Sequence, residues 1–203
     1  AKQPNHPPFS EDKKVADLYT SFMDEARLEA LGIKPLESEL ARIDALKDKK
    51  ELAAMFAHLH RIGADAPFNG TVRQDNRDST QYIVNLEQSG LGMPDRDYFL
   101  LKDPKFTQLR KEYLAYLQKV FELLGSKDAA KQAKDVLAFE TALAAKQWTN
   151  VELRDPVKIY NKYEVAKLKP LMPGFDWDSY LKDAGIGSAA IVINEPSYFS
   201  APD

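Results

Sequence analysis

The chain has 203 residues, of which 44% are hydrophobic and 29% charged, with a net charge of −3. A chain of this length buries roughly 70% of the surface that it exposes when unfolded, which predicts one domain, or a large and a small one. Its acidic and basic residues are mixed along the sequence, which argues against nucleic-acid binding, and the absence of cysteine excludes disulfides, thiolate zinc sites and cysteine nucleophiles.

The N-terminal part is expected to be helical after a flexible lead-in over residues 1–13. That lead-in lacks the apolar core of a signal peptide, and no apolar run in the chain reaches the ~20 residues of a transmembrane helix. From Glu11 to Leu31 apolar residues recur at helical spacing. Ser10 is the expected N-cap of this helix, and Gly32 follows its last turn.

Two further amphipathic helices are expected before the pattern changes. One begins at Pro35, which suits the first turn of a helix. The other runs from about Lys50 to Ile62 and ends at Gly63. Three such helices in succession predict a helical layer.

Strand patterns appear at two places in the chain. Between Phe68 and Leu86, β-branched residues alternate with polar ones on either side of the sequence DNRDS. This predicts a short β-hairpin or two extended segments. Near the C-terminus, AIVIN (Ala190 to Asn194) predicts another strand.

Helices are expected to dominate the rest of the chain. The sequence predicts them from Pro104 to Gly125, from about Asp128 to Trp148, from Pro156 to Tyr163, and after Asp176 as an N-cap. The expected fold class is mainly α: a multi-helix domain with a small β-hairpin and short strands.

The stretch QSGLGMPDRDYFL, Gln88 to Leu100, carries a G-x-G pattern at Gly90 and Gly92. A dinucleotide-binding fingerprint needs a third glycine where this chain has Asp95, and the nearby carboxylates would repel phosphate. Glycine-permitted backbone followed by Pro94 instead predicts a turn.

The three histidines predict no metal site. His6 lies in the lead-in, whereas His58 and His60 are two apart on a predicted helix and therefore point in nearly opposite directions. A zinc-binding pair on a helix needs a spacing of four, as in H-E-x-x-H. We expect one surface histidine and one packed histidine.

A few carboxylate and arginine side chains stand out as possible functional groups. Glu140 lies in the apolar run VLAFETALA and is expected to be buried beside a structural partner such as an arginine. Arg96-Asp97 and Arg154-Asp155 lie in predicted loops, where a guanidinium typically ties loops together by bidentate bonds. Substrate binding is the alternative for these two pairs.

Asn69-Gly70-Thr71 matches a glycosylation sequon, but Asn-Gly is also a favoured hairpin turn, and we expect the turn. No G-x-S-x-G nucleophile elbow occurs in the sequence. These patterns predict no catalytic, cofactor-binding or metal-binding residue in this chain.

Four segments taken in order resemble one protein family. They are YTSFMDEARLEALGIKPLESELARIDAL, QSGLGMPDRDYFL, WTNVELRDPVKIYNKY and PGFDWDSYL. Their order and spacing are similar to the N-terminal, non-catalytic region of the neprilysin, endothelin-converting enzyme and bacterial PepO family of zinc metalloendopeptidases. The resemblance extends from about Lys14 to Tyr198.

The resemblance implies a role without catalytic residues. Family members hold zinc through H-E-x-x-H and a downstream E-x-x-x-D, and none of these motifs occurs in this sequence. Residues 14–203 are therefore expected to be the helical domain that covers the active site and limits substrate size, truncated before the catalytic domain. A stand-alone helical protein-interaction module is the alternative.

The resemblance also implies partners and a location. The expected partners are the C-terminal catalytic domain of the same protein, contacted through Arg96, Asp97, Arg154 and Asp155, and the peptide substrates of the parent enzyme. Zinc is expected in the parent enzyme and not in this chain. The lack of cysteine favours a bacterial member, located in the periplasm, secreted or at the cell surface, with the cytoplasm as the alternative.

Overall fold

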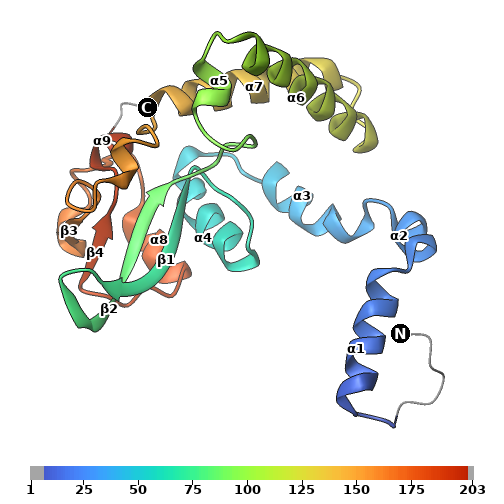
Figure 1. Ribbon diagram of the computed structural model, residues 1–203, viewed down its shortest axis with the longest axis horizontal. Helices are drawn as coiled ribbons and strands as arrows, with labels where there is room; N and C mark the ends of the chain where they lie inside the picture. Colours follow the sequence, from blue (N-terminus) through green and yellow to red (C-terminus); the bar gives the residue numbers. More distant parts are fainter. Residues whose placement is uncertain (1–6, 201–203) are drawn as a thin grey trace. The chain divides into compact units, whose positions relative to one another are not determined.

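The computed structural model describes residues 7–200 of the chain. Backbone contacts divide the chain into two compact units, Ala1–Ala45 and Leu46–Asp203, which are called unit 1 and unit 2. Figure 1 shows the elements of each unit in chain order. The two units are described separately.

Unit 1 consists of short helices. They are α1 (Glu11–Phe22), α2 (Glu25–Leu31), the 3-10 turn η1 (Lys34–Leu36) and α3 (Glu37–Asp44). Ser10 caps α1 as predicted, because its hydroxyl accepts a hydrogen bond from the Lys13 amide at 3.2 Å.

The single helix predicted from Glu11 to Leu31 is wrong, because the chain breaks after Phe22. Asp24 begins a new helix there, and its carboxylate accepts a hydrogen bond from the Arg27 amide at 3.1 Å. Aspartate competes in this way for backbone amides that a continuous helix would use, so apolar spacing alone does not reveal the interruption.

Unit 1 has no buried residue among its described residues 7–45. Large apolar side chains are exposed along its helices instead: Val15, Leu18, Phe22, Leu28, Leu36 and Ile43. Helices of this length gain most of their stability from packing an apolar face. The apolar side chains of unit 1 therefore need a surface outside these helices.

Unit 2 begins with η2 (Lys49–Glu51) and α4 (Leu52–Ile62), close to the predicted limits. The helix ends at Gly63, which takes a left-handed conformation with a φ of 76°. A side chain is strained in that conformation, so this glycine ends the helix as its position predicted.

A four-stranded sheet follows α4. It contains β1 (Phe68–Asp75), β2 (Asp78–Gln88), β3 (Asn161–Glu164) and β4 (Ala190–Ile193) in the order β1-β2-β4-β3. The hairpin of β1 and β2 confirms the sequence prediction, and β4 is the predicted C-terminal strand. β4 is parallel to β2, where Val84 pairs with Ile191, and antiparallel to β3. The sheet is thus larger than predicted, within a mainly helical fold.

The helix predicted from Pro156 to Tyr163 is wrong. The chain forms turns over residues 156–159 and then β3, whose Lys162 pairs with Val192 of β4. A partner strand distant in sequence decides this conformation, which is why local helical spacing misled.

After β2, unit 2 contains two long helices, α6 and α7, and several short ones. They are α5 (Asp97–Leu100), α6 (Pro104–Leu123), α7 (Ala129–Lys146), η3 (Glu152–Arg154), η4 (Val165–Lys167), α8 (Trp177–Asp183) and α9 (Pro196–Phe199). α6 and α7 form an antiparallel pair, visible in Figure 1. Asp176 caps α8 as predicted, accepting a hydrogen bond from the Ser179 amide at 3.1 Å.

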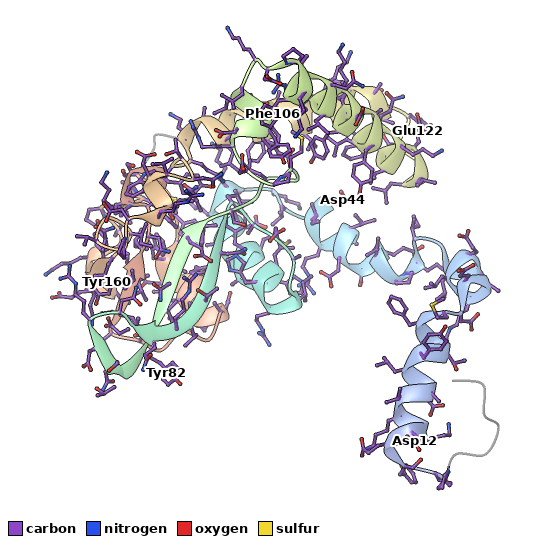
Figure 2. All side chains as sticks on the ribbon, viewed as in Figure 1. Asp12, Asp44, Tyr82, Phe106, Glu122 and Tyr160 are labelled. Carbon is purple, nitrogen blue, oxygen red and sulfur yellow. The ribbon has the colours of Figure 1, made fainter. Side chains whose placement is uncertain are left out.

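Unit 2 has two hydrophobic clusters. The first lies between the sheet and the helices α4, α8 and α9, and Phe68 is central to it, with the Tyr180 ring 5.2 Å and the Phe56 ring 5.9 Å away. The second lies among α5, α6 and α7 around Met93, Phe99 and Ala144. Outside these clusters β2 carries exposed side chains such as Tyr82, labelled in Figure 2.

Asp75 ties the end of β1 to β3. Its side chain is 2% exposed and accepts hydrogen bonds from the Arg77 amide at 2.9 Å, the Tyr160 hydroxyl at 2.7 Å and the Lys162 ammonium at 3.0 Å. These donors, the Arg77 amide first, lower the pKa of Asp75 to about 2. The Arg77 guanidinium also lies 4.6 Å from the centre of the Tyr160 ring. This cluster holds the hairpin against the far edge of the sheet.

We expect Asp75→Asn to lower the urea midpoint of unfolding, because the variant loses the carboxylate that these donors stabilise. Since folding lowers the pKa of Asp75, its contribution is fully present above about pH 4 and is lost as the pH falls toward about 2. The difference between wild type and variant should therefore shrink as the pH falls. Circular dichroism over a urea series at several pH values measures it. The matched control is Asp135→Asn, at an exposed pair with Lys131, and an Asp75→Asn effect independent of pH would contradict the prediction.

Candidate functional site

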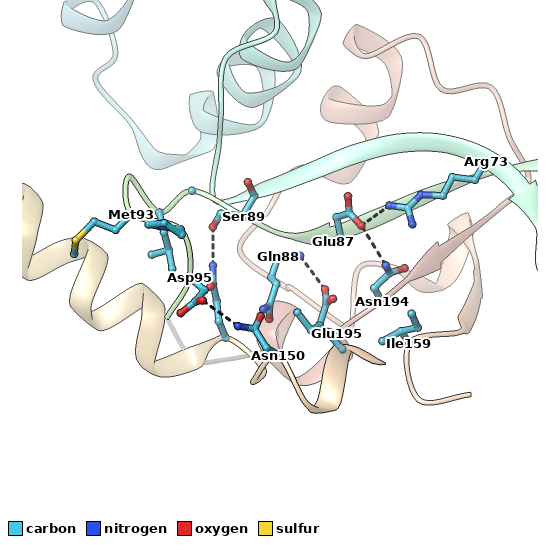
Figure 3. Close-up of a pocket in the computed structure, with 15 residues that line it drawn as sticks. Arg73, Glu87, Gln88, Ser89, Met93, Asp95, Asn150, Ile159, Asn194 and Glu195 are labelled. Carbon is cyan, nitrogen blue, oxygen red and sulfur yellow. Dashed lines mark hydrogen bonds and ion pairs between the residues drawn. The ribbon is translucent and has the colours of Figure 1, made fainter. Parts of the chain in front are cut away.

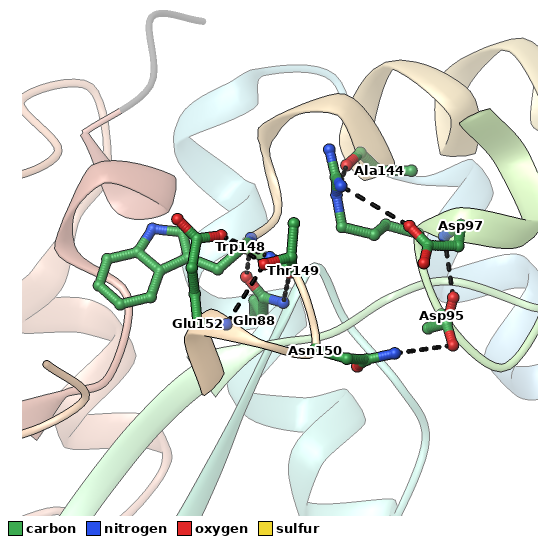
Figure 4. A network of polar contacts seen from close by, with 9 residues as sticks. Gln88, Asp95, Asp97, Ala144, Trp148, Thr149, Asn150 and Glu152 are labelled. Carbon is green, nitrogen blue, oxygen red and sulfur yellow. Dashed lines mark hydrogen bonds and ion pairs between the residues drawn. The ribbon is translucent and has the colours of Figure 1, made fainter. Parts of the chain in front are cut away.

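Gln88, the last residue of β2, joins the sheet to the segment that follows α7. Its side-chain amide donates to the Trp148 carbonyl at 3.0 Å and accepts from the Trp148 amide at 2.7 Å, as Figure 4 shows. A primary amide side chain used in this way pairs with the backbone as a neighbouring strand would. The Gln88 amide itself donates to Glu195 at 2.8 Å.

Two more side-chain amides reinforce this junction. Gln147 donates to the Ser89 carbonyl at 2.9 Å, and Asn150 donates to the Asp95 carboxylate at 3.0 Å. Polar side chains therefore tie the loop after β2 to the loop after α7.

The two glycines of the G-x-G pattern are required by close packing. Gly90 has a φ of 85°, and a Cβ atom there would lie 2.9 Å from the Ala66 carbonyl oxygen. A Cβ atom on Gly92 would lie 2.0 Å from the Tyr113 hydroxyl oxygen. The chain bends from Gly92 to Asp95 as predicted, and both glycines allow close packing at this bend.

Glu140 is buried as predicted, with 8% of its surface exposed. Its Oε1 atom accepts hydrogen bonds from the Gly92 amide at 3.0 Å and the Tyr113 hydroxyl at 3.1 Å, so the predicted arginine partner is wrong. Burial raises the pKa of Glu140, against the lowering effect of these two donors. Two uncharged donors, a backbone amide and a hydroxyl, thus take the place of the expected arginine.

The bidentate bonds predicted for the two Arg-Asp pairs are not the bonds that form. Arg96 Nε donates to the Ala144 carbonyl at 3.3 Å, near the C-terminal end of α7, and Arg96 Nη1 lies 3.7 Å from Asp97 Oδ1 (Figure 4). A cation at that end of a helix is favourable. Arg154 is exposed in η3, and Asp155 accepts from backbone amides in the following turn.

His60 is the packed histidine that the sequence predicts. Its Nδ1 lies 3.0 Å from the Tyr180 hydroxyl and its Nε2 lies 2.6 Å from the Phe68 carbonyl oxygen. His58 is partly buried on the same helix, and His6 lies outside the described residues. Within residues 7–200, no group of three or more His, Asp or Glu side chains is arranged to hold a metal ion.

The turn predicted at Asn69-Gly70 is wrong, because both residues lie inside β1. The hairpin turns instead between Asp75 and Asp78. Gly70 pairs with Leu86 of β2, and a Cβ atom on it would lie 3.3 Å from the Leu86 side chain. The Asn69 side-chain amide donates a hydrogen bond to the Ser89 hydroxyl at 3.1 Å, so Asn69 also contacts the loop after β2.

A groove that the sequence did not predict lies beside this junction. It has a volume of about 410 Å³, and Figure 3 shows its lining. Arg73, Glu87, Asp95, Asn194 and Glu195 are among the polar residues of its lining. We call it the junction groove. The sequence signal for it was weak: two polar residues directly after the apolar strand β4.

Glu195 is the most deeply buried of these side chains, with 2% of its surface exposed. Its Oε2 atom accepts the hydrogen bond from the Gln88 amide. Burial raises the pKa of Glu195 to about 7; the Gln88 amide and Arg73 act against the rise, and Glu87 adds to it. Glu195 therefore changes charge near neutral pH.

Comparison with known proteins places the chain in a family. The family model described as peptidase family M13 matches residues 1–202. Endothelin-converting enzyme 1 from Bos taurus is 31% identical over 93% of this chain and 27% of its own length. The endothelin-converting enzyme homolog from Locusta migratoria is 30% identical over 87% of this chain and 26% of its own length.

Solved structures agree with these sequence matches. The zinc metalloprotease Zmp1 from Mycobacterium tuberculosis, in complex with an inhibitor, superimposes with a TM-score of 0.86 at 35% identity, over 94% of this chain and 30% of its own. PepO from Lactobacillus rhamnosis shares the fold, with a TM-score of 0.68 at 18% identity over 87% of this chain and 29% of its own.

The chain belongs to peptidase family M13, as the resemblance of its four segments indicated. It corresponds to the N-terminal region of these zinc metallopeptidases and spans between a quarter and a third of the length of the relatives named above. No helix among the described residues is both long and apolar enough to cross a membrane.

We expect Gly92→Ala to destabilise unit 2 by about 1–3 kcal/mol, because the added methyl group collides with Tyr113. Its control is Gly187→Ala, where a Cβ atom meets nothing within 4 Å and the backbone needs no glycine. That substitution should change stability by less than about 0.5 kcal/mol. Equal effects of the two substitutions on the free energy of unfolding in urea would contradict the prediction.

The free energy of unfolding should also depend on the ionisation of Glu195. Folding raises the pKa of Glu195, so the ionised carboxylate disfavours the folded state, and its cost develops as the pH rises from about 4.5 through about 7. Glu195→Gln should therefore become more stable relative to wild type between about pH 5 and about pH 8. Urea midpoints measured across this range test it, and a constant difference would show that Glu195 titrates normally.

Proposed function

We propose that residues 14–203 form the non-catalytic domain that covers the active site of a zinc metalloendopeptidase. The observation that carries the proposal is the match to Zmp1, a zinc metalloprotease, over 94% of this chain but 30% of that protein. The absence of H-E-x-x-H from the sequence supports it, because the zinc ligands then belong to another part of the parent enzyme.

The proposed domain acts by enclosure. A cover over the active site admits peptides, excludes folded proteins and keeps bulk water from the reaction. Zinc held by the catalytic domain would activate a water molecule for peptide hydrolysis. Residues of the present chain would limit which substrates reach that centre.

The apolar side chains of unit 1 support a large partner surface. Val15, Leu18 and Phe22 are each more than two-thirds exposed on α1, and exposed apolar surface of this kind marks contact sites. We assign this surface to the remainder of the parent peptidase. Arg154 and Asp155 remain candidates for polar contacts with it, whereas the Arg96 guanidinium already bonds within unit 2.

Two further parts of the proposal follow from family membership. The parent enzyme would act outside the cytoplasm, in a bacterial periplasm, at a cell surface or after secretion. Its substrates would be peptides. A stand-alone interaction module is the competing function, and the exposed apolar side chains of unit 1 favour the peptidase.

We expect the purified 203-residue chain to show no zinc-dependent cleavage of a short quenched fluorescent peptide. The coding DNA beyond Asp203 should continue into H-E-x-x-H and E-x-x-x-D, and the protein from the whole frame should cleave that peptide. The same cleavage sequence placed inside a folded protein should resist the enzyme. Zinc-dependent turnover by the 203 residues alone, or a stop codon directly after Asp203, would overturn the proposal.

A further inference from the structure

Several donor side chains of the junction groove already make hydrogen bonds within the protein. Arg73 Nη2 lies 2.5 Å from Glu87 Oε2, and Arg73 Nε donates to the Thr71 hydroxyl. The side-chain amides of Asn150 and Gln147 donate to Asp95 and to the Ser89 carbonyl. These bonds occupy part of the donor capacity of the groove, and Arg73 keeps further N–H groups beside Glu87.

One wall of the groove carries a buried hydrogen-bond acceptor that lacks a donor among the described residues. The Asn194 side chain is 5% exposed, and its Oδ1 atom has no donor among the described residues, while its Nδ2 donates to Glu87 at 3.4 Å. Glu195 uses Oε2 for the Gln88 amide, and its Oε1 has no donor from another described residue. A buried acceptor without a donor is rare in folded proteins, which makes Asn194 Oδ1 notable.

The charge of the groove also favours a cation. Glu87, Asp95 and Glu195 contribute carboxylates, and Arg73 is the single cationic side chain in the lining. Figure 3 shows Glu87 between Arg73 and Asn194, with Glu195 close by. The carboxyl groups of Glu87 and Glu195 thus lie on the same wall as the Asn194 oxygen that lacks a donor.

We propose that the junction groove binds a guanidinium group, between Glu195, Glu87 and the Asn194 side-chain oxygen. A guanidinium carries five N–H donors in a planar fork and no acceptor, which complements a wall of acceptors. Paired with a carboxylate, it forms short, charge-assisted hydrogen bonds. The volume of about 410 Å³ is within the range of small-ligand sites and has room for an arginine side chain.

A bare metal ion suits the groove less well. No group of three or more His, Asp or Glu side chains in the described part of the chain converges on one point. Oxygen-ligand metals need more ligands at short distances than these two or three acceptors supply. The proposal goes beyond the covering role suggested above and does not depend on it.

Binding is tested with N-acetyl-L-arginine amide and N-acetyl-L-citrulline amide as probes. The second replaces the guanidinium by a neutral urea group of nearly the same shape. We expect the arginine probe to bind the 203-residue chain at least about tenfold more tightly, because only it carries a positive charge. Isothermal titration at about pH 8, above the pKa of about 7 of Glu195, measures the affinities, and NMR shifts of the Asn194 side-chain amide and the Gln88 backbone amide locate the site.

Three variants sharpen the test. Glu195→Gln keeps the shape and an acceptor for the Gln88 amide but removes the charge, and it should weaken arginine binding by about tenfold or more. Arg73→Gln frees Glu87 at an exposed position and should tighten binding several-fold, a gain that misfolding cannot produce. Glu112→Gln, on the exposed face of α6, should bind as wild type does.

The outcomes separate cleanly. Equal affinity for the two probes, or arginine binding that neither Glu195→Gln nor Arg73→Gln changes, would overturn the proposal. If the proposal holds, the same titration with acetyl-Ala-Arg-Ala-amide identifies the source of the guanidinium. Tighter binding of the tripeptide assigns it to an arginine of a peptide chain, whereas weaker binding assigns it to a free small molecule.

Discussion

Gln88 connects the two hydrophobic clusters of unit 2. Its backbone amide bonds to Glu195 at the end of β4, and its side chain bonds to both backbone groups of Trp148 after α7. One cluster packs beneath the sheet and the other among α5, α6 and α7. Helix α7 also joins them, with Leu143 packed against the first cluster and Ala144 in the second, and the hydrogen bonds of Gln88 add directed contacts to this packing.

The packing of the stretch from Gln88 to Leu100 follows from this link. Once Gln88 is held, the chain has to pass close to Ala66 and Tyr113 to reach α5, and glycine at positions 90 and 92 is the residue that fits. At the same place the Glu140 carboxyl group accepts a hydrogen bond from the Gly92 backbone amide. The junction groove then opens between the two loops that these contacts position. A potential binding surface is thus a consequence of joining two clusters by polar side chains.

Much of the fold was predictable because its signals are local. Caps and stops at Ser10, Gly63 and Asp176 depend on backbone groups within one helical turn, and the hairpin strands show their own alternation. The errors share a cause at a longer range. Residues 156–163 became turns and a strand because β4 lies alongside, and Asn69-Gly70 stayed in β1 because the register with β2 places the turn elsewhere.

The amino-acid sequence by itself determined the family, the mainly helical class and the absence of the zinc-binding motif, since each of these depends on residue identity and order along the chain. The tertiary structure alone decided which polar groups meet. Glu195 and Gln88 are 107 residues apart, and Asp75 and Lys162 are 87 apart. The burial that raises one carboxyl pKa and the donors that lower the other arise when the strands assemble. Desolvation and hydrogen bonding are properties of the assembled fold, so no local pattern encodes them.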